Sequence, residues 1–82
     1  MTNLEKYRKA FIDALEIEEE KVEIEELAYQ DIPQWDSVGH MGLIAELEDT
    51  FDIMMDTDDI IDFNSYKAGK EIMKKYGVVI GE

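Results

Sequence analysis

The chain has 82 residues, no cysteine and a formal net charge of −13, with 21 acidic against 8 basic residues. We expect a single domain, residues 1–82, and at this size folding buries only about 60% of the unfolded surface, which disfavours a deep active site. The absence of cysteine excludes disulfides, thiolate zinc sites and cysteine nucleophiles. A negative field of this strength repels nucleic acid and anionic lipid, whereas it attracts basic protein surfaces.

No targeting segment is expected at the start of the chain, because charged residues interrupt each apolar stretch there. The longest apolar run is far too short for a membrane span. We therefore expect a cytoplasmic protein without a membrane span. Repulsion between like charges favours a monomer.

Residues 2–16 predict the first helix, because apolar side chains recur there at helical spacing. Thr2 and Glu5 form a candidate capping box at its start. The apolar face consists of Leu4, Tyr7, Phe11, Ile12 and Leu15.

Residues 17–35 predict a long acidic loop. Glu16 to Glu26 carries seven glutamates against one lysine, and Val22, Ile24 and Leu27 are expected to attach the loop to a core. Pro33 prevents a helix from continuing through the loop into the next element.

Residues 37–51 predict the second helix, with Asp36 as its N-cap. Two apolar stripes are expected on this helix. The core stripe consists of His40, Leu43, Ile44, Leu47 and Phe51. The second stripe, Val38, Met41 and Ala45, is expected to be exposed, with Glu48 and Asp49 at its edge.

Two further helices complete the expected fold. Residues 57–63 predict a short third helix, which follows Asp56 or Thr57 as cap and buries Ile60, Ile61 and Phe63. Residues 65–76 predict a fourth helix that starts after Asn64 or Ser65, ends at Gly77, and uses Tyr66, Gly69, Ile72, Met73 and Tyr76 for packing. No strand pattern is present, so the sequence predicts an all-α protein, a small four-helix bundle with three longer helices and one short helix.

Two catalytic or metal-binding interpretations are disfavoured. Asp36, Ser37 and His40 supply the residue types of a hydrolase triad, but a capping Asp36 binds backbone amides and no nucleophile elbow is present. The segment from Asp56 departs from the calcium-loop pattern, because Ile60 and Ile61 stand where a ligand and a glycine are required. We therefore expect neither an enzyme nor a metal site.

Ser37 has a different chemical possibility. A hydroxyl in the first turn of a helix lies beside unpaired amides and the positive end of the helix dipole, where an attached phosphodiester is well placed. An exposed apolar stripe with acidic neighbours follows directly. The position is thus suited to a phosphate-linked group that is presented to partners.

The segment "WDSVGHMGLIAELEDTFDI" resembles the modification region of the acyl carrier proteins, in which an Asp-Ser-Leu-type motif opens the second helix. A core series of Leu43, Leu47 and Phe51 follows, and the order of the elements is similar along nearly the whole chain. The resemblance implies that Ser37 receives 4'-phosphopantetheine from coenzyme A through a phosphopantetheinyl transferase. The thiol of this arm would carry acyl groups as thioesters between biosynthetic enzymes of fatty acid, polyketide or related specialised metabolism.

The resemblance also implies two surfaces. The first is a docking face for the transferase and for acyl-loading and acyl-transferring enzymes with basic patches, made of Asp36, Val38, Met41, Ala45, Glu48 and Asp49. The second is an acyl cavity near Ile44, Leu47, Ile61 and Met73.

The sequence departs from the family pattern at three positions after Ser37. Val38 replaces the familiar leucine, and Gly39 and Gly42 stand where fatty-acid carriers often have polar or acidic residues. Each glycine costs a helix about 1 kcal/mol relative to alanine, and we hypothesise that the two glycines tune docking to a dedicated set of partners. The departures favour a free-standing carrier of a specialised pathway. An aminoacyl or D-alanyl carrier, or an unmodified acidic adaptor that binds a basic protein, remain alternatives.

Overall fold

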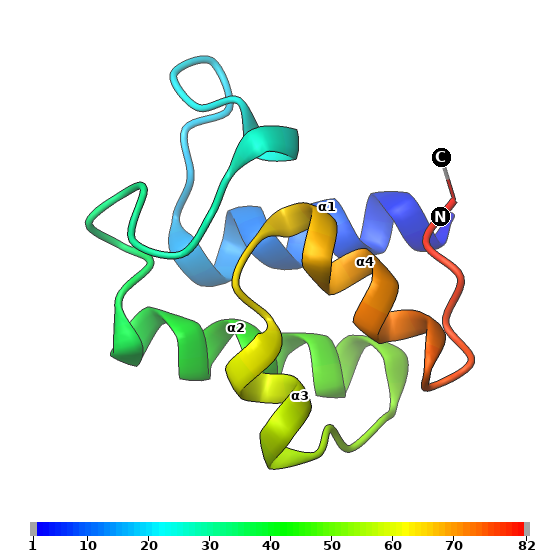
Figure 1. Ribbon diagram of the computed structural model, residues 1–82. Helices are drawn as coiled ribbons and strands as arrows, with labels where there is room; N and C mark the ends of the chain where they lie inside the picture. The colour runs from blue at the N-terminus through cyan, green and yellow to red at the C-terminus, as the bar shows by residue number, and fades with distance from the viewer. Residues whose placement is uncertain (1, 82) are drawn as a thin grey trace.

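A computed structural model describes residues 2–81, which form four α-helices and one short 3-10 helix, without a β-strand in this range. The elements are α1 (Asn3–Leu15), η1 (Ile24–Glu26), α2 (Ser37–Phe51), α3 (Thr57–Asp62) and α4 (Tyr66–Lys74). Helices α1 and α2 run alongside each other in opposite directions, and α3 and α4 lie across one side of this pair (Figure 1). The predicted all-α bundle is confirmed.

Local caps define three helix starts. In α1 the Thr2 hydroxyl accepts from the Glu5 amide at 3.1 Å, and the Thr2 amide donates to the Glu5 carboxylate at 2.8 Å, so the predicted capping box is present. Asp36 caps α2 and Ser65 caps α4, each by accepting from an amide three residues ahead. Because these bonds involve near neighbours, the helix starts follow from the local sequence.

The core is centred on aromatic side chains that come from α1, the acidic loop and the two ends of the α3–α4 connection. The Phe11 ring lies 5.5 Å from that of Trp35 and 4.9 Å from that of Tyr66, between centroids. Five aromatic residues are fully buried: Tyr7, Phe11, Trp35, Phe63 and Tyr66. Large rings fill the thin bundle that a short chain can build.

The acidic loop is attached to the bundle at its second half. Ile24 and Leu27 are buried and Val22 is half-buried, as predicted. The Leu27 carbonyl accepts from the Tyr66 amide at 2.9 Å, and the Tyr29 amide donates to the Asn64 carbonyl at 2.9 Å. These two bonds hold the loop against the start of α4.

Two details of the last helices differ from the prediction. Helix α4 ends at Lys74, and Gly77 follows with a left-handed φ of 79°. In α3 the side chain of Ile61 is 70% exposed, whereas Asp59 is only 5% exposed. The predicted burial of Ile61 is wrong, because Asp59 faces α4, where Lys75 and Tyr76 bind its carboxylate.

Every helix described between residues 2 and 81 is too short or too polar to cross a lipid bilayer.

Candidate functional site

Ser37 is the first residue of α2 and is exposed. Asp36 directly before it is extended, and its carboxylate accepts from the Gly39 amide at 2.9 Å. The Asp36 carbonyl accepts from the His40 amide at 2.8 Å, which closes the first helical turn. The Ser37 and Val38 amides precede that bond and point out of the helix end. The serine hydroxyl therefore lies at the positive end of the α2 dipole.

His40, one turn after Ser37 on α2, links this helix to the acidic loop and to α3. Its Nδ1 accepts from the Trp35 indole N–H at 3.0 Å, and its Nε2 lies 2.8 Å from the Ile60 carbonyl oxygen. Because an indole can only donate, Nδ1 is the acceptor and Nε2 carries the proton given to Ile60. Both ring nitrogens are engaged, so neither is available as a base for Ser37 in this arrangement.

A pocket of about 330 Å³ opens between α2 and α3 beside Ser37. Most of its lining surface is apolar, and its volume lies near the lower end of the range for small-molecule sites, about 300–1,000 Å³. It is lined by Tyr29, Ser37, His40, Met41, Ile60, Ile61, Phe63 and Asn64. A group attached to the Ser37 hydroxyl would begin at the rim of this pocket.

The pocket differs from the cavity expected from the sequence. Of the four residues predicted to surround an acyl chain, Ile61 lines the pocket, whereas Ile44, Leu47 and Met73 are buried in the closed core. The fully buried Phe63 ring lines the pocket and also stacks near Phe11, with centroids 6.0 Å apart, and so separates the pocket from that core. Sequence reasoning missed Tyr29 and Asn64, because their approach depends on the backbone bond between them.

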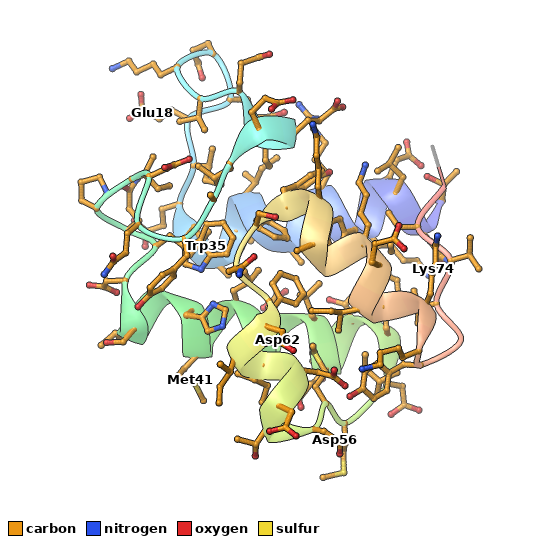
Figure 2. The ribbon with its side chains drawn as sticks, in the orientation of Figure 1. Glu18, Trp35, Met41, Asp56, Asp62 and Lys74 are labelled. Atoms are coloured by element: carbon orange, nitrogen blue, oxygen red, sulfur yellow. The ribbon has the colours of Figure 1, made fainter. Side chains whose placement is uncertain are left out.

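The apolar stripe predicted on α2 is exposed. Val38 is 79% and Met41 is 57% exposed, and Ala45 and Asp49 are also at the surface. Figure 2 shows Trp35 directed into the space between α1 and α2, while Met41 points away from α1. Exposed Ile61 on α3 lines the same pocket as Met41, so the exposed apolar surface extends from α2 to α3.

Glu48, predicted to belong to the docking face, is half-buried and accepts from the Met55 amide at 2.9 Å. Its carboxylate thus also stabilises the connection between α2 and α3.

The two glycines of α2 have different surroundings. A Cβ added at Gly39 would collide with the backbone carbonyl of Gln34 and approach the Leu15 side chain at 3.2 Å. A Cβ at Gly42 would meet no atom within 4 Å. Packing alone accounts for Gly39, so the docking hypothesis is not needed for that residue.

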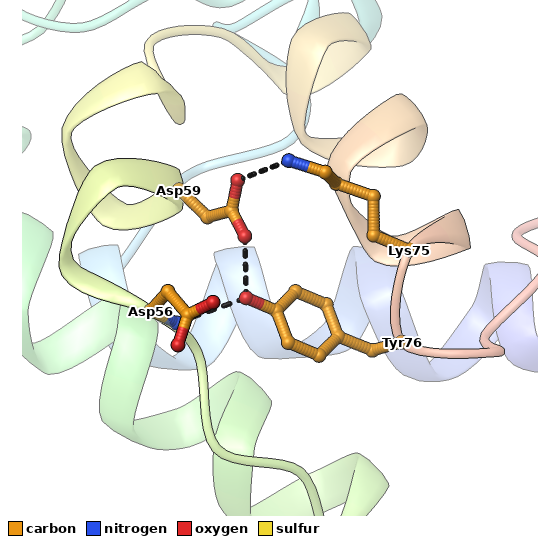
Figure 3. Close-up of polar contacts among 4 residues, drawn as sticks. All are labelled: Asp56, Asp59, Lys75 and Tyr76. Carbon is orange, nitrogen blue, oxygen red and sulfur yellow. Dashed lines mark hydrogen bonds and ion pairs between the residues drawn. The ribbon is translucent and has the colours of Figure 1, made fainter.

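A polar cluster connects α3 with the end of α4, on the side of α3 away from α2. The Asp59 carboxylate accepts from Lys75 Nζ at 2.7 Å and from the Tyr76 hydroxyl at 2.5 Å (Figure 3). The hydrogen bond from Lys75 lowers the pKa of Asp59, and the same bond raises the pKa of Lys75. Both side chains are therefore held in their charged forms at neutral pH.

Residues 2–81 hold no group of three or more histidine, aspartate or glutamate side chains arranged to bind a metal ion. Comparison with protein-family models, with curated proteins and with solved structures gave no match.

Proposed function

We propose that the protein is a carrier whose Ser37 receives 4'-phosphopantetheine and whose arm holds an acyl group as a thioester. The observation that carries this proposal is the exposed Ser37 hydroxyl at the start of α2, on the rim of an apolar pocket. The Asp36-Ser37 motif and the order of the helices, which resemble those of acyl carrier proteins, support the same role. The chain would act as a substrate carrier and not as an enzyme.

The local electrostatics suit a phosphodiester at Ser37. The first amides of α2 have no acceptor within the helix, and the helix dipole favours a negative group at this end. Asp36 already satisfies the Gly39 amide, which leaves the Ser37 and Val38 amides for a phosphate. The arm would then extend towards partner enzymes or fold back to the pocket.

The surface around Ser37 suits transient docking of basic partners. Val38, Met41 and Ile61 offer apolar contact area next to Ser37. No lysine or arginine occurs between residues 36 and 62, so α2 and α3 contribute acidic side chains and no lysine or arginine to this surface. Such a surface accelerates encounter with positively charged proteins and allows fast release in salt. We expect the partners to be a phosphopantetheinyl transferase and the enzymes that load and unload the acyl group.

The intact mass of the protein tests the proposal. Incubation of the purified chain with coenzyme A, magnesium and a broad-specificity phosphopantetheinyl transferase should add one phosphopantetheine. Ser65→Ala provides a matched control, because Ser37 and Ser65 are the two serines of the chain and the Ser65 hydroxyl caps α4. Ser37→Ala should abolish the mass gain and Ser65→Ala should retain it. An unchanged mass for the wild type, with several transferases, would contradict the proposal.

The exposed apolar side chains in acidic surroundings also favour a second function, that of an unmodified adaptor for a basic protein. Ser37→Ala separates the two functions, since the substitution removes only an exposed hydroxyl and leaves the Asp36 cap in place. A carrier would lose all function with its fold intact, whereas an adaptor would bind its partner as before. If Ser37 is modified, the group transferred to the thiol distinguishes an acyl from an aminoacyl carrier.

A further inference from the structure

Helix α3 forms one wall of the pocket and contacts α4 on its other side. Ile60 and Ile61 line the pocket, whereas Asp59, one residue earlier, is directed to the end of α4. Because α3 has only six residues, its position depends on what each of these sides contacts. The width of the pocket is therefore coupled to the bond between α3 and α4.

Polar bonds fix the α4 side of α3. The Tyr76 hydroxyl donates to Asp59 and accepts from the Asp56 amide at 2.9 Å, so one phenol group contacts both the N-cap residue and the first turn of the helix (Figure 3). Lys75 adds a charged bond from a side chain that is itself 64% exposed. Two of these three bonds end on the Asp59 carboxylate and two involve the Tyr76 hydroxyl, so the loss of either residue removes most of the cluster.

The apolar contacts of α3 are weak by comparison. Ile61 is 70% exposed and Ile60 is only half-buried. On the pocket side, one hydrogen bond from His40 to the Ile60 carbonyl joins α3 to α2. Segments with few buried apolar contacts open at low free energy while the remaining structure stays folded. Helix α3 can thus move as a unit once its polar bonds break.

We propose that the Asp59, Lys75 and Tyr76 cluster determines the size of the apolar group that the pocket admits. With the cluster intact, α3 keeps the pocket at about 330 Å³, closed towards the core by Phe63. This space suits a short acyl chain, and a longer chain enters only when α3 leaves the position in which its bonds to Lys75 and Tyr76 hold it. The identity of the bound group as an acyl chain rests on the proposed function, but the control of pocket size by α3 does not.

The unmodified protein tests the control of pocket size by α3. Tyr76→Phe removes the hydroxyl and keeps the ring, and Lys75→Met removes the charged bond. Exposed residues next to the cluster give matched controls, namely Asp58→Ala on α3 and Lys74→Met on α4. Both cluster variants should bind the neutral apolar dye N-phenyl-1-naphthylamine several-fold more tightly than the wild type, and the controls should not.

Amide hydrogen exchange shows whether the effect is local. In Tyr76→Phe, residues 57–62 should exchange several-fold faster than in the wild type, whereas α1 should keep its wild-type rates. Dye affinity equal to that of the controls would overturn the proposal. So would equal acceleration in α1 and α3, because it would show that the whole bundle had loosened.

A series of acylated proteins tests the chain-length limit. The wild type and Tyr76→Phe are loaded from butanoyl-, hexanoyl-, octanoyl- and decanoyl-coenzyme A, and the rise in thermal midpoint over the unacylated arm is measured. The rise should level off at the shorter chains in the wild type and continue to the longer chains in Tyr76→Phe. Identical profiles would overturn the limit. If no arm attaches to Ser37, the proposed function fails, and the dye and exchange results still decide the role of α3.

Discussion

At the scale of single residues, Gly39 and Gly42 occupy nearby positions in one helix, but the presence of glycine has a different physical explanation at each. Gly39 lies in the first turn, where the carbonyl of Gln34 occupies the space that a Cβ would need. Gly42 faces open space. The first glycine lets the loop pack tightly against α2, whereas the second only weakens the helix.

Alanine substitutions distinguish the two glycines. Gly42→Ala should raise the free energy of unfolding by about 1 kcal/mol, because alanine restricts the unfolded chain and favours the helix. Gly39→Ala should lower it by about 1–3 kcal/mol, because the backbone of Gln34 must move. Urea denaturation followed by circular dichroism measures both values. A stabilising effect of both substitutions would show that Gln34 yields without cost.

At the scale of elements, the helix starts could be predicted and the contacts of α3 could not. Thr2, Asp36 and Ser65 bind amides three residues ahead, so their patterns are visible in the sequence. The burial of Asp59 depends on partners 16 and 17 residues away, and a six-residue helix has too little periodicity to define a buried face.

The candidate site was predictable to a similar extent. The position of Ser37 in the first turn of α2 follows from Pro33 and Asp36 in the local sequence. The lining of the pocket does not, because Tyr29 and Asn64 meet through the isolated backbone bridge between Ala28 and Ser65 and the bonds around it. Pairing across such a separation leaves no local signal.

His40 is the residue that links the acidic loop, α2 and α3. His40→Phe keeps an aromatic ring beside Trp35 but leaves the indole N–H and the Ile60 carbonyl without a partner. We expect a loss of about 1–3 kcal/mol in the free energy of unfolding. Met41→Ala, at the exposed neighbouring position, should change it by less than about 0.5 kcal/mol. Equal urea midpoints for the two variants would show that the hydrogen bonds of His40 contribute nothing.

At the scale of the whole molecule, charge is unevenly distributed. The cations of α1 and α4 contact nearby groups, as in the pairs Arg8 with Glu19 and Lys67 with Glu26. Helices α2 and α3 carry no lysine or arginine, and among the described residues Asp59 is their only acid that forms an ion pair, with Lys75. The resulting repulsion acts on the half of the protein that contains Ser37 and the pocket.

Salt should therefore stabilise the protein. The Debye length is about 30 Å at 0.01 M and falls to about 10 Å at 0.1 M ionic strength, so sodium chloride screens repulsion between exposed acids. We expect the thermal midpoint to rise over this range. Asp58→Asn removes one exposed acid and should raise the midpoint at low salt while reducing the response to salt. A midpoint that falls on addition of salt would mean that attractive pairs dominate the electrostatics of the fold.

The Asn3 side chain donates to the Val79 carbonyl at 3.0 Å, which places both ends of the described chain at one end of the bundle. Figure 1 shows α2 beginning at the opposite end. A tag, a fused domain or a bead joined to either end would leave from the side remote from Ser37. The protein can therefore be immobilised through either terminus with Ser37 presented to the solution, an orientation that allows the proposed modification to be tested on a fixed chain.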